Sequence, residues 1–210
     1  MNAIIDADAA ARAGWGVLDF ARACLDGGAT FLQLRAKDAA GGWLLETAEA
    51  IVTMGAPHGA QVVVNDRAEI ARLAGAAGVH VGQEDLSPEA ARRLVGPQRI
   101  VGLSTHTIAQ LDAAVHAPVD YVAIGPVFGT ASKATGYDAV GIGMVEQAAA
   151  RAHRHGLRVV AIGGITLDRA VEVIRAGADS VAVISDLLST GDPRARVCEY
   201  LERLSSAGRV

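Results

Sequence analysis

Polar and apolar residues alternate in Gln33-Leu34-Arg35-Ala36-Lys37, which directly follows an apolar run. Successive side chains of a β-strand point to opposite faces, so Gln33, Arg35 and Lys37 are expected to converge at the end of one strand. An amide and two cations on one face suit a multiply charged anion, such as a diphosphate or a triphosphate. The simpler interpretation is a solvated exit from a strand.

Two aspartates follow the next two apolar runs, in Asn65-Asp66-Arg67 and in the segment from His80 to Asp85. Carboxylates on neighbouring strand exits suit Mg²⁺, which keeps several waters and takes further oxygens from a substrate phosphate. Either aspartate alone could instead cap a helix, although Ser87-Pro88-Glu89 is the better start for the helix after Asp85. His80 lies inside an apolar run, where it is either a neutral core histidine or a donor to a heteroaromatic ligand.

The two following exits add groups that could bind phosphate. Ser104 ends the fifth apolar run and could donate to a phosphate oxygen, whereas His106 is interpreted as structural. The glycine-rich loop after the sixth run is the longest polar loop of the chain, and loops of that length are usually functional. Its Thr130, Ser132 and Lys133 suit an anion that is covered when the loop closes. The alternative is a mobile surface loop.

The exits of the last two apolar runs contain Gly163-Gly164 and Ile184-Ser185. In a barrel of parallel strands, backbone amides at these two exits form a common phosphate site, helped by a helix N-terminus. The two glycines let the main chain approach a phosphate closely. The sequence therefore predicts a monophosphate subsite here, across the mouth from the cationic, Mg²⁺-compatible subsite.

These exits need a scaffold that brings them to one place. Short runs rich in valine and isoleucine recur about every 25 residues, with helical patterns between them. Nearly continuous apolar runs are typical of parallel strands that are covered on both faces. Eightfold alternation of strand and helix predicts an α/β fold, a closed (β/α)8 or TIM barrel, with its chemistry at the carboxyl ends of the strands. The predicted strands are 3–6, 30–35, 61–65, 78–81, 99–104, 120–125, 158–163 and 179–185.

Composition narrows the class of protein. The chain has 210 residues, a formal net charge of −4 and two cysteines, and residues 1–210 are expected to form a single barrel domain. The negative charge argues against broad nucleic-acid binding, so any attraction for an anion must be local. No apolar run approaches the roughly 20 residues that cross a bilayer, and no secretory signal is recognised. A cytoplasmic protein with reduced thiols, and with no membrane or nucleic-acid partner, is expected.

The polar residues also limit the kind of catalysis. No Ser-His-Asp or Cys-His arrangement is indicated, and no lysine lies deep within a predicted strand as a Schiff-base candidate. Without a strong nucleophile or base, electrostatic and positional catalysis is more plausible than covalent catalysis.

Six segments form a specific combination, because Gln-x-Arg-x-Lys is followed in order by Gly-Gln-Glu-Asp. Together they resemble the thiamine-phosphate synthase family, also called the thiamine-phosphate pyrophosphorylases, over nearly the whole chain. The segments are Gln33-Leu34-Arg35-x-Lys37, Asn65-Asp66-Arg67, Gly78 to Asp85, Gly102 to His106, Gly125 to Lys133 and Ala161 to Ile165.

The family joins 4-amino-2-methyl-5-hydroxymethylpyrimidine diphosphate to hydroxyethylthiazole phosphate and releases pyrophosphate. The resemblance implies a transferase, with Asp66 and Asp85 holding Mg²⁺ and with Arg35, Lys37 and Lys133 as the catalytic cations of a dissociative displacement. It also suggests a homo-oligomer. Its binding partners would be these two phosphorylated small molecules. The implied contacts are Arg35, Lys37, Asn65, Ser104 and Lys133 with the diphosphate, Gln33 and His80 with the pyrimidine, and Thr130, Ser132, Gly164, Ile184 and Ser185 with the thiazole phosphate.

The chain departs from the family pattern at two positions. Asn2 stands where the first strand usually carries an aromatic residue that lines the pyrimidine pocket, and Ala36 stands where an acidic residue is common. Three rival functions are each compatible with part of the sequence. A thiazole tautomerase of the same superfamily would not need the diphosphate and Mg²⁺ residues. A barrel isomerase would need an acid and base pair that the exits lack. A non-catalytic binder of thiamine precursors would not turn over both substrates.

Overall fold

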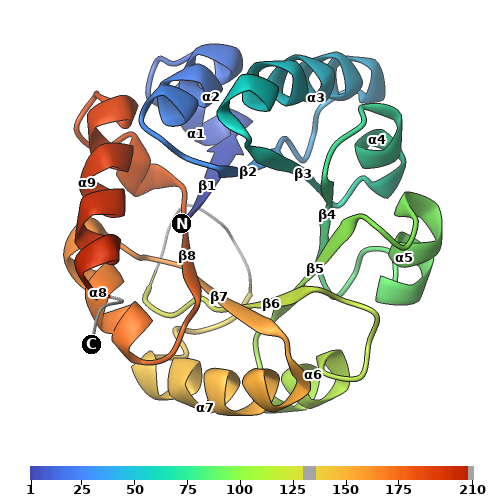
Figure 1. Ribbon diagram of the computed structural model, residues 1–210, viewed down its shortest axis with the longest axis vertical. Coiled ribbons are helices and arrows are strands. Elements are labelled where there is room, and N and C mark those ends of the chain that lie inside the picture. Colours follow the sequence, from blue (N-terminus) through green and yellow to red (C-terminus); the bar gives the residue numbers. More distant parts are fainter. Residues whose placement is uncertain (130–135, 208–210) are drawn as a thin grey trace.

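The computed structural model describes residues 1–129 and 136–207. Eight parallel strands follow one another around a closed barrel, each paired with its neighbours in sequence, and β8 pairs with β1. Figure 1 looks along the barrel and shows the strands inside a ring of helices. The predicted TIM barrel is therefore confirmed. The strands are β1 (Asn2–Asp6), β2 (Phe31–Arg35), β3 (Gln61–Asn65), β4 (Gly78–Val81), β5 (Ile100–Thr105), β6 (Tyr121–Ile124), β7 (Arg158–Ile162) and β8 (Ser180–Val183).

The strand ends agree with the sequence at β3 and β4 and differ by one or two residues elsewhere. The largest difference is at β8, which was predicted to run to residue 185 and ends at Val183. The backbone leaves the extended region at Ile184, with φ −114° and ψ −88°, and a short 3₁₀ helix, η3 (Ser185–Leu187), follows. Apolar character alone does not show such a turn, because Ile184 is itself buried.

Helices cover the outer face of the barrel, and some of them begin with a side-chain cap. Ser87 accepts a hydrogen bond from Ala90 N at the start of α5 (Pro88–Val95), and Thr107 accepts one from Gln110 N at the start of α6 (Ile108–Ala114). The α-helices of the described chain are α1 (Ala7–Arg12), α2 (Val17–Asp26), α3 (Gly41–Gly55), α4 (Ala68–Leu73), α5 (Pro88–Val95), α6 (Ile108–Ala114), α7 (Ile142–Ala152), α8 (Leu167–Arg175) and α9 (Pro193–Ala207).

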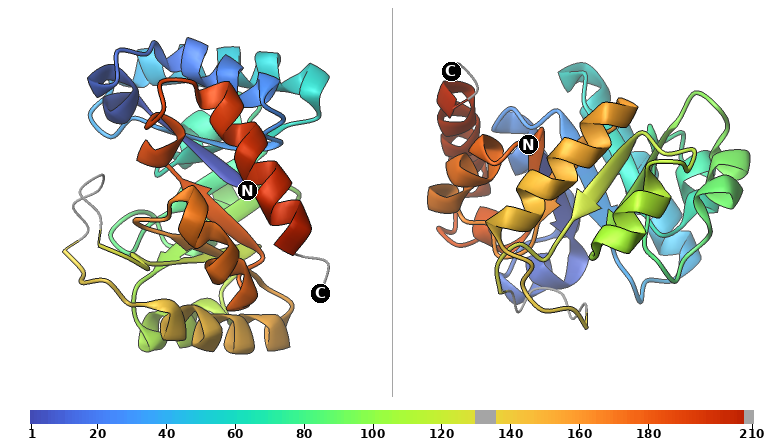
Figure 2. Two further views of the ribbon diagram at one scale, coloured as in Figure 1. Left: turned by 90° about the vertical axis from the view of Figure 1, so that its left-hand side faces the viewer. Right: turned by 90° about the horizontal axis from the view of Figure 1, so that it is seen from below.

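The helices and the outer strand faces form one hydrophobic core. Phe20, Leu44 and Ile51 are buried in it together with outward-facing strand residues such as Leu32 and Val64. The C-terminal helix α9 packs against both α8 and α2, so it closes the ring of helices between them (Figures 1 and 2). Within the described residues, none of the helices combines the length and apolar character needed to span a membrane.

The register decides which side chains share the barrel interior. Asp6 pairs with Arg35 between β1 and β2, and Asn65 pairs with His80 between β3 and β4. Gly102 on β5 lies opposite His80. Paired residues of parallel strands point to the same face, so polar groups from β1 to β5 gather in the interior.

Candidate active site

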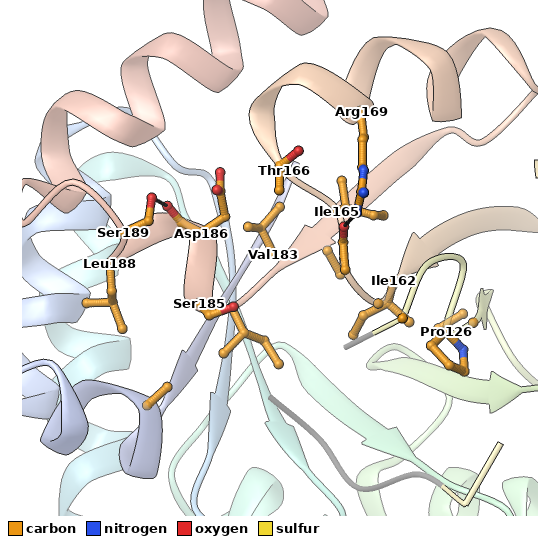
Figure 3. A pocket seen from close by; sticks show the side chains of 18 of the residues that line it. Pro126, Ile162, Ile165, Thr166, Arg169, Val183, Ser185, Asp186, Leu188 and Ser189 are labelled. Carbon is orange, nitrogen blue, oxygen red and sulfur yellow. Dashed lines mark hydrogen bonds between the residues drawn. The ribbon is translucent and has the colours of Figure 1, made fainter. Parts of the chain in front are cut away.

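A cavity of about 750 Å³ opens at the carboxyl ends of β5 to β8, a size typical of small-molecule sites. Figure 3 shows Thr166 and Arg169, at the start of α8, on one side of it and Ser185 beside the end of β8 on another. The predicted monophosphate residues Gly164, Ile184 and Ser185 all line this cavity.

The Gly163-Gly164 turn is built so that only glycine fits. The backbone has φ 99° at Gly163 and 61° at Gly164, a region that favours glycine. A β-carbon on Gly163 would lie 2.5 Å from Cα of Pro126, and one on Gly164 would lie 2.6 Å from the carbonyl oxygen of Gly129. The turn therefore packs directly against the loop after β6, and its main chain lines the cavity. Arg169 donates to the Gly164 carbonyl at 2.9 Å and fixes the turn to α8.

One carboxylate, for which the sequence predicts no role, anchors the exit of β8. Oδ2 of Asp186 accepts from Tyr200 Oη at 2.6 Å, from Arg196 Nε and Nη2 at 3.1 and 2.9 Å, and from Leu167 N at 3.2 Å. Burial and the nearby Asp186 charge raise the pKa of the Tyr200 phenol well above its usual value, so it stays a donor. Asp186 thereby connects η3, which begins at Ser185, to α8 and α9.

A layer of hydrogen-bonded polar groups fills the barrel interior. His80 Nδ1 lies 2.8 Å from Tyr121 Oη and its Nε2 lies 2.8 Å from Ser104 Oγ. Burial raises the pKa of the Tyr121 phenol, and a hydrogen bond with Gln33 offsets part of that effect. Gly102 makes room for the ring, since a β-carbon there would overlap Tyr121. The structure thus brings the predicted Gln33, His80 and Ser104 together around a tyrosine that sequence reasoning missed.

The predicted cations separate into two environments. Arg35 shares the inner face with Gln33, is buried, and forms an ion pair with Asp6 through Nη1. Asp6 also accepts from Ala9 N at 2.8 Å, so it caps α1 while it pairs with Arg35. Lys37 lies beyond the strand, half-exposed, with Nζ 3.7 Å from Asp66 Oδ2. Asn65, at the end of β3, is buried and lines the interior with Arg35.

The two aspartates proposed as metal ligands lie at the exits of β3 and β4, which are neighbours. Neither is the N-cap residue of the following helix, because those positions belong to Arg67 and Ser87. Asp66 has φ 65°, unusual for a residue with a side chain, and donates its N–H to the His80 carbonyl at 2.7 Å. Such backbone strain persists where surrounding structure enforces it, often at functional sites. Asp85 is exposed and accepts from Gly82 N at 2.7 Å.

A metal at these exits would have few protein ligands. Among residues 1–129 and 136–207, no three His, Cys, Asp or Glu side chains are grouped closely enough to hold an ion. Two carboxylates with water and substrate oxygens are a donor set that fits Mg²⁺, and a poor one for a metal that needs a closed protein shell.

The remaining predicted groups belong to the loop after β6 and its surroundings. Thr130, Ser132 and Lys133 lie outside the described residues. His106, interpreted as structural, hydrogen-bonds the Gly125 carbonyl through Nδ1 and stacks on Tyr137 with ring centroids 4.0 Å apart. It also lines the large cavity, so it supports the wall at the base of that loop.

A family model, relatives in sequence and a solved structure all relate this chain to the same family of proteins. A family model described as thiamine monophosphate synthase matches residues 2–187. The thiamine-phosphate synthase of Koribacter versatilis is 46% identical over 187 residues, covering 89% of this chain and 86% of the relative. That of Xanthobacter autotrophicus is 44% identical over 178 residues, covering 85% and 83%. The solved thiamine phosphate pyrophosphorylase from Pyrococcus furiosus superposes with a TM-score of 0.88 at 28% identity, covering 99% and 96%.

Proposed function

The chain belongs to the thiamine-phosphate synthase family and is a transferase of thiamine biosynthesis, and we propose that it joins an aminopyrimidine diphosphate to a thiazole phosphate. The observation that carries this assignment to specific substrates is that two cavities adjoin and share part of their lining. The large cavity at the exits of β5 to β8 shares Ser104, Ala123, Ile162, Ala182 and Ile184 with the polar barrel interior. Two substrates can therefore meet along this shared wall.

The thiazole phosphate takes the large cavity. The Gly163-Gly164 main chain and the turn at Ser185 support a phosphate, because both sit beside the N-terminus of α8, whose dipole favours an anion. Asp186 holds that turn in place through Arg196 and Tyr200. Thr130 and Ser132 complete the phosphate contacts in this proposal. With its phosphate anchored, the thiazole nitrogen is held in line with the carbon it attacks.

The pyrimidine diphosphate lies between the interior and the exits of β2 to β4. Gln33 and His80 face the pyrimidine ring, while Lys37, Asn65, Ser104 and Lys133 bind the diphosphate. Arg35 joins them, because within the described residues Asp6 engages only one of its terminal nitrogens. Asp66 and Asp85 hold Mg²⁺, which neutralises negative charge on the leaving group when it is bound.

The reaction these groups support is a dissociative displacement. The C–O bond to the diphosphate breaks first, the electron-rich aminopyrimidine stabilises the resulting cation, and the thiazole nitrogen then supplies the electron pair for the new C–N bond. The protein needs no nucleophile of its own. Its cations stabilise the departing pyrophosphate, while the large cavity and the polar exits of β2 to β4 hold the two substrates within reach of each other. The proposal places this reaction in the cytoplasm.

Thiamine phosphate formation is the direct test. The purified protein is given both substrates with and without Mg²⁺, and thiamine phosphate and pyrophosphate are measured together. Equal amounts of both products, formed only with Mg²⁺, are expected, and a thiazole tautomerase or a passive binder would release no pyrophosphate. Asp66→Ala combined with Asp85→Ala should abolish Mg²⁺-dependent turnover.

The matched control removes two exposed carboxylates from the outer helices, Glu146→Ala on α7 with Glu172→Ala on α8. It changes the net charge equally and should keep turnover. Undiminished Mg²⁺-dependent turnover after loss of Asp66 and Asp85 would contradict the metal assignment.

A further inference from the structure

Two buried polar atoms in the barrel lack a hydrogen-bond partner within the described residues, Oδ1 of Asn2 and Nε of Arg35. Asn2 is only 3% exposed and Arg35 only 8%. Both side chains line the same small interior cavity, together with Gln33, Asn65 and His80. A buried polar group without a partner destabilises the folded state, so an unpaired acceptor and an unpaired donor on two residues that line one cavity call for an occupant.

The size of that space limits the occupant. The interior cavity holds about 20 Å³, close to the room needed for one water molecule or one amino group. It is far too small for a ring. Asn2 pairs with Ala182 on β8, and Ala182 lines both this cavity and the large one. The small cavity therefore adjoins the larger site, and the largest group that it can take from a ring bound beside it is a small substituent.

We propose that this small cavity receives the exocyclic amino group of the aminopyrimidine, with Asn2 Oδ1 as its acceptor. Arg35 Nε then donates to the adjacent ring nitrogen. An aminopyrimidine edge presents a donor beside an acceptor, which complements the two unpaired atoms. The assignment rests on the proposed function and adds a specificity-determining residue to it.

The test compares two ligands that differ only in the group entering the small cavity. They are 4-amino-5-hydroxymethyl-2-methylpyrimidine and its counterpart with a methyl group in place of the amino group, each titrated calorimetrically into the full chain. Both lack the diphosphate, so the result is independent of the metal. The unmodified protein should prefer the amino ligand about tenfold, the effect of one hydrogen bond. Asn2→Leu, similar in size, should reduce that ratio to near one.

Two further measurements separate recognition from a structural role. Asn2→Leu should unfold at an unchanged or higher temperature, because an apolar side chain removes a buried unpaired acceptor. A residue with a structural hydrogen bond would instead lose stability. Ile4→Val is the control, since Ile4 lines the same small cavity without a polar atom and its shortening should preserve the tenfold ratio.

Equal affinity of the unmodified protein for the two ligands would overturn the proposal and mean that the small cavity holds only an ordered water. A tenfold preference that survives Asn2→Leu would overturn it as well, and so would a clear loss of stability in that variant. Failure of the proposed function gives a different result, the absence of thiamine phosphate when the unmodified protein is given both substrates and Mg²⁺.

Discussion

Substitution of Asp186 should destabilise the proposed phosphate-binding end of the barrel strongly. Asp186→Ala removes the acceptor shared by Arg196, Tyr200 and the first N–H of α8. The side chains of Asp186 and Arg196 are only 12% and 16% exposed, so solvent screens their interaction weakly. Loss of this residue leaves a partly buried cation and a buried tyrosine hydroxyl without the carboxylate that they share.

The expected magnitude follows from these contacts. Breaking a buried ion pair by removing one partner costs about 3–5 kcal/mol. The lower value applies here because Arg196 also pairs with Glu199 at 2.9 Å, so its charge keeps one partner. For a chain of this length each kcal/mol lowers the midpoint of thermal unfolding by about 2–4 °C, which gives a decrease of roughly 6–12 °C. Since Ser185 adjoins Asp186, the KM for the thiazole phosphate should rise more than the KM for the pyrimidine diphosphate.

Thermal unfolding followed by circular dichroism, with steady-state kinetics for both substrates, checks these expectations. Asp168→Ala is the matched control, because Asp168 also pairs with an arginine of α9, Arg203, at 2.7 Å but is 89% exposed. Exposed pairs contribute little, so that variant should unfold close to the unmodified temperature. If Asp186→Ala unfolds at the same temperature as Asp168→Ala, the argument that this carboxylate anchors the exit of β8 is refuted.

Three further experiments test the backbone at Asp66, the packing at Gly102 and the burial of Cys24. Asp66→Asn should keep stability, because asparagine tolerates the left-handed backbone at φ 65°, yet lose Mg²⁺-dependent turnover, whereas Asp66→Ala should also lose about 1–2 kcal/mol in chemical denaturation. Gly102→Ala should cost about 1–3 kcal/mol of unfolding free energy, since its β-carbon overlaps Tyr121; an unchanged midpoint would contradict that packing. Burial raises the pKa of the Cys24 thiol to about 12, so at pH 8 a thiol reagent should label only the half-buried Cys198 in the folded protein. Labelling of both thiols in the folded protein would contradict the burial of Cys24. The free energy of unfolding should fall as pH rises from about 9 towards 12, because the Cys24 thiol then ionises in the unfolded chain alone.

The sequence predicts the barrel well because its strongest signal is physical and local. Parallel strands covered on both faces must be apolar nearly throughout, as in Gln61–Asn65 and Gly78–Val81, where the predicted and observed strands coincide. Helix starts at Ser87 and Thr107 follow equally local rules, because one hydroxyl accepts from an N–H three residues away. Each signal is complete within a few residues and needs no knowledge of the rest of the fold.

Contacts between residues that lie far apart in the sequence are harder to predict from local patterns. The alternation from Gln33 to Arg35 correctly predicts a shared inner face, but the pairing of Arg35 with Asp6 depends on the register of β1 against β2. The contacts of Asp186 depend on α9, which follows it along the chain and folds back against α8. A pattern along one segment contains neither relation.

In the polar layer of the barrel interior, contacts between distant residues shape the proposed binding site. Tyr121 reads in the sequence as one more residue of an apolar strand, and only the absence of a side chain at Gly102, on the neighbouring strand, allows its ring to reach His80. The barrel thus buries His80 and its partners where aliphatic residues would pack at lower cost. Because Asn2 Oδ1 and Arg35 Nε find no hydrogen-bond partner among residues 1–129 and 136–207, internal hydrogen bonding there does not account for the whole layer. A polar ligand that enters from the exits of the strands supplies the missing partners, which links the least predictable part of the fold to the specificity of the site.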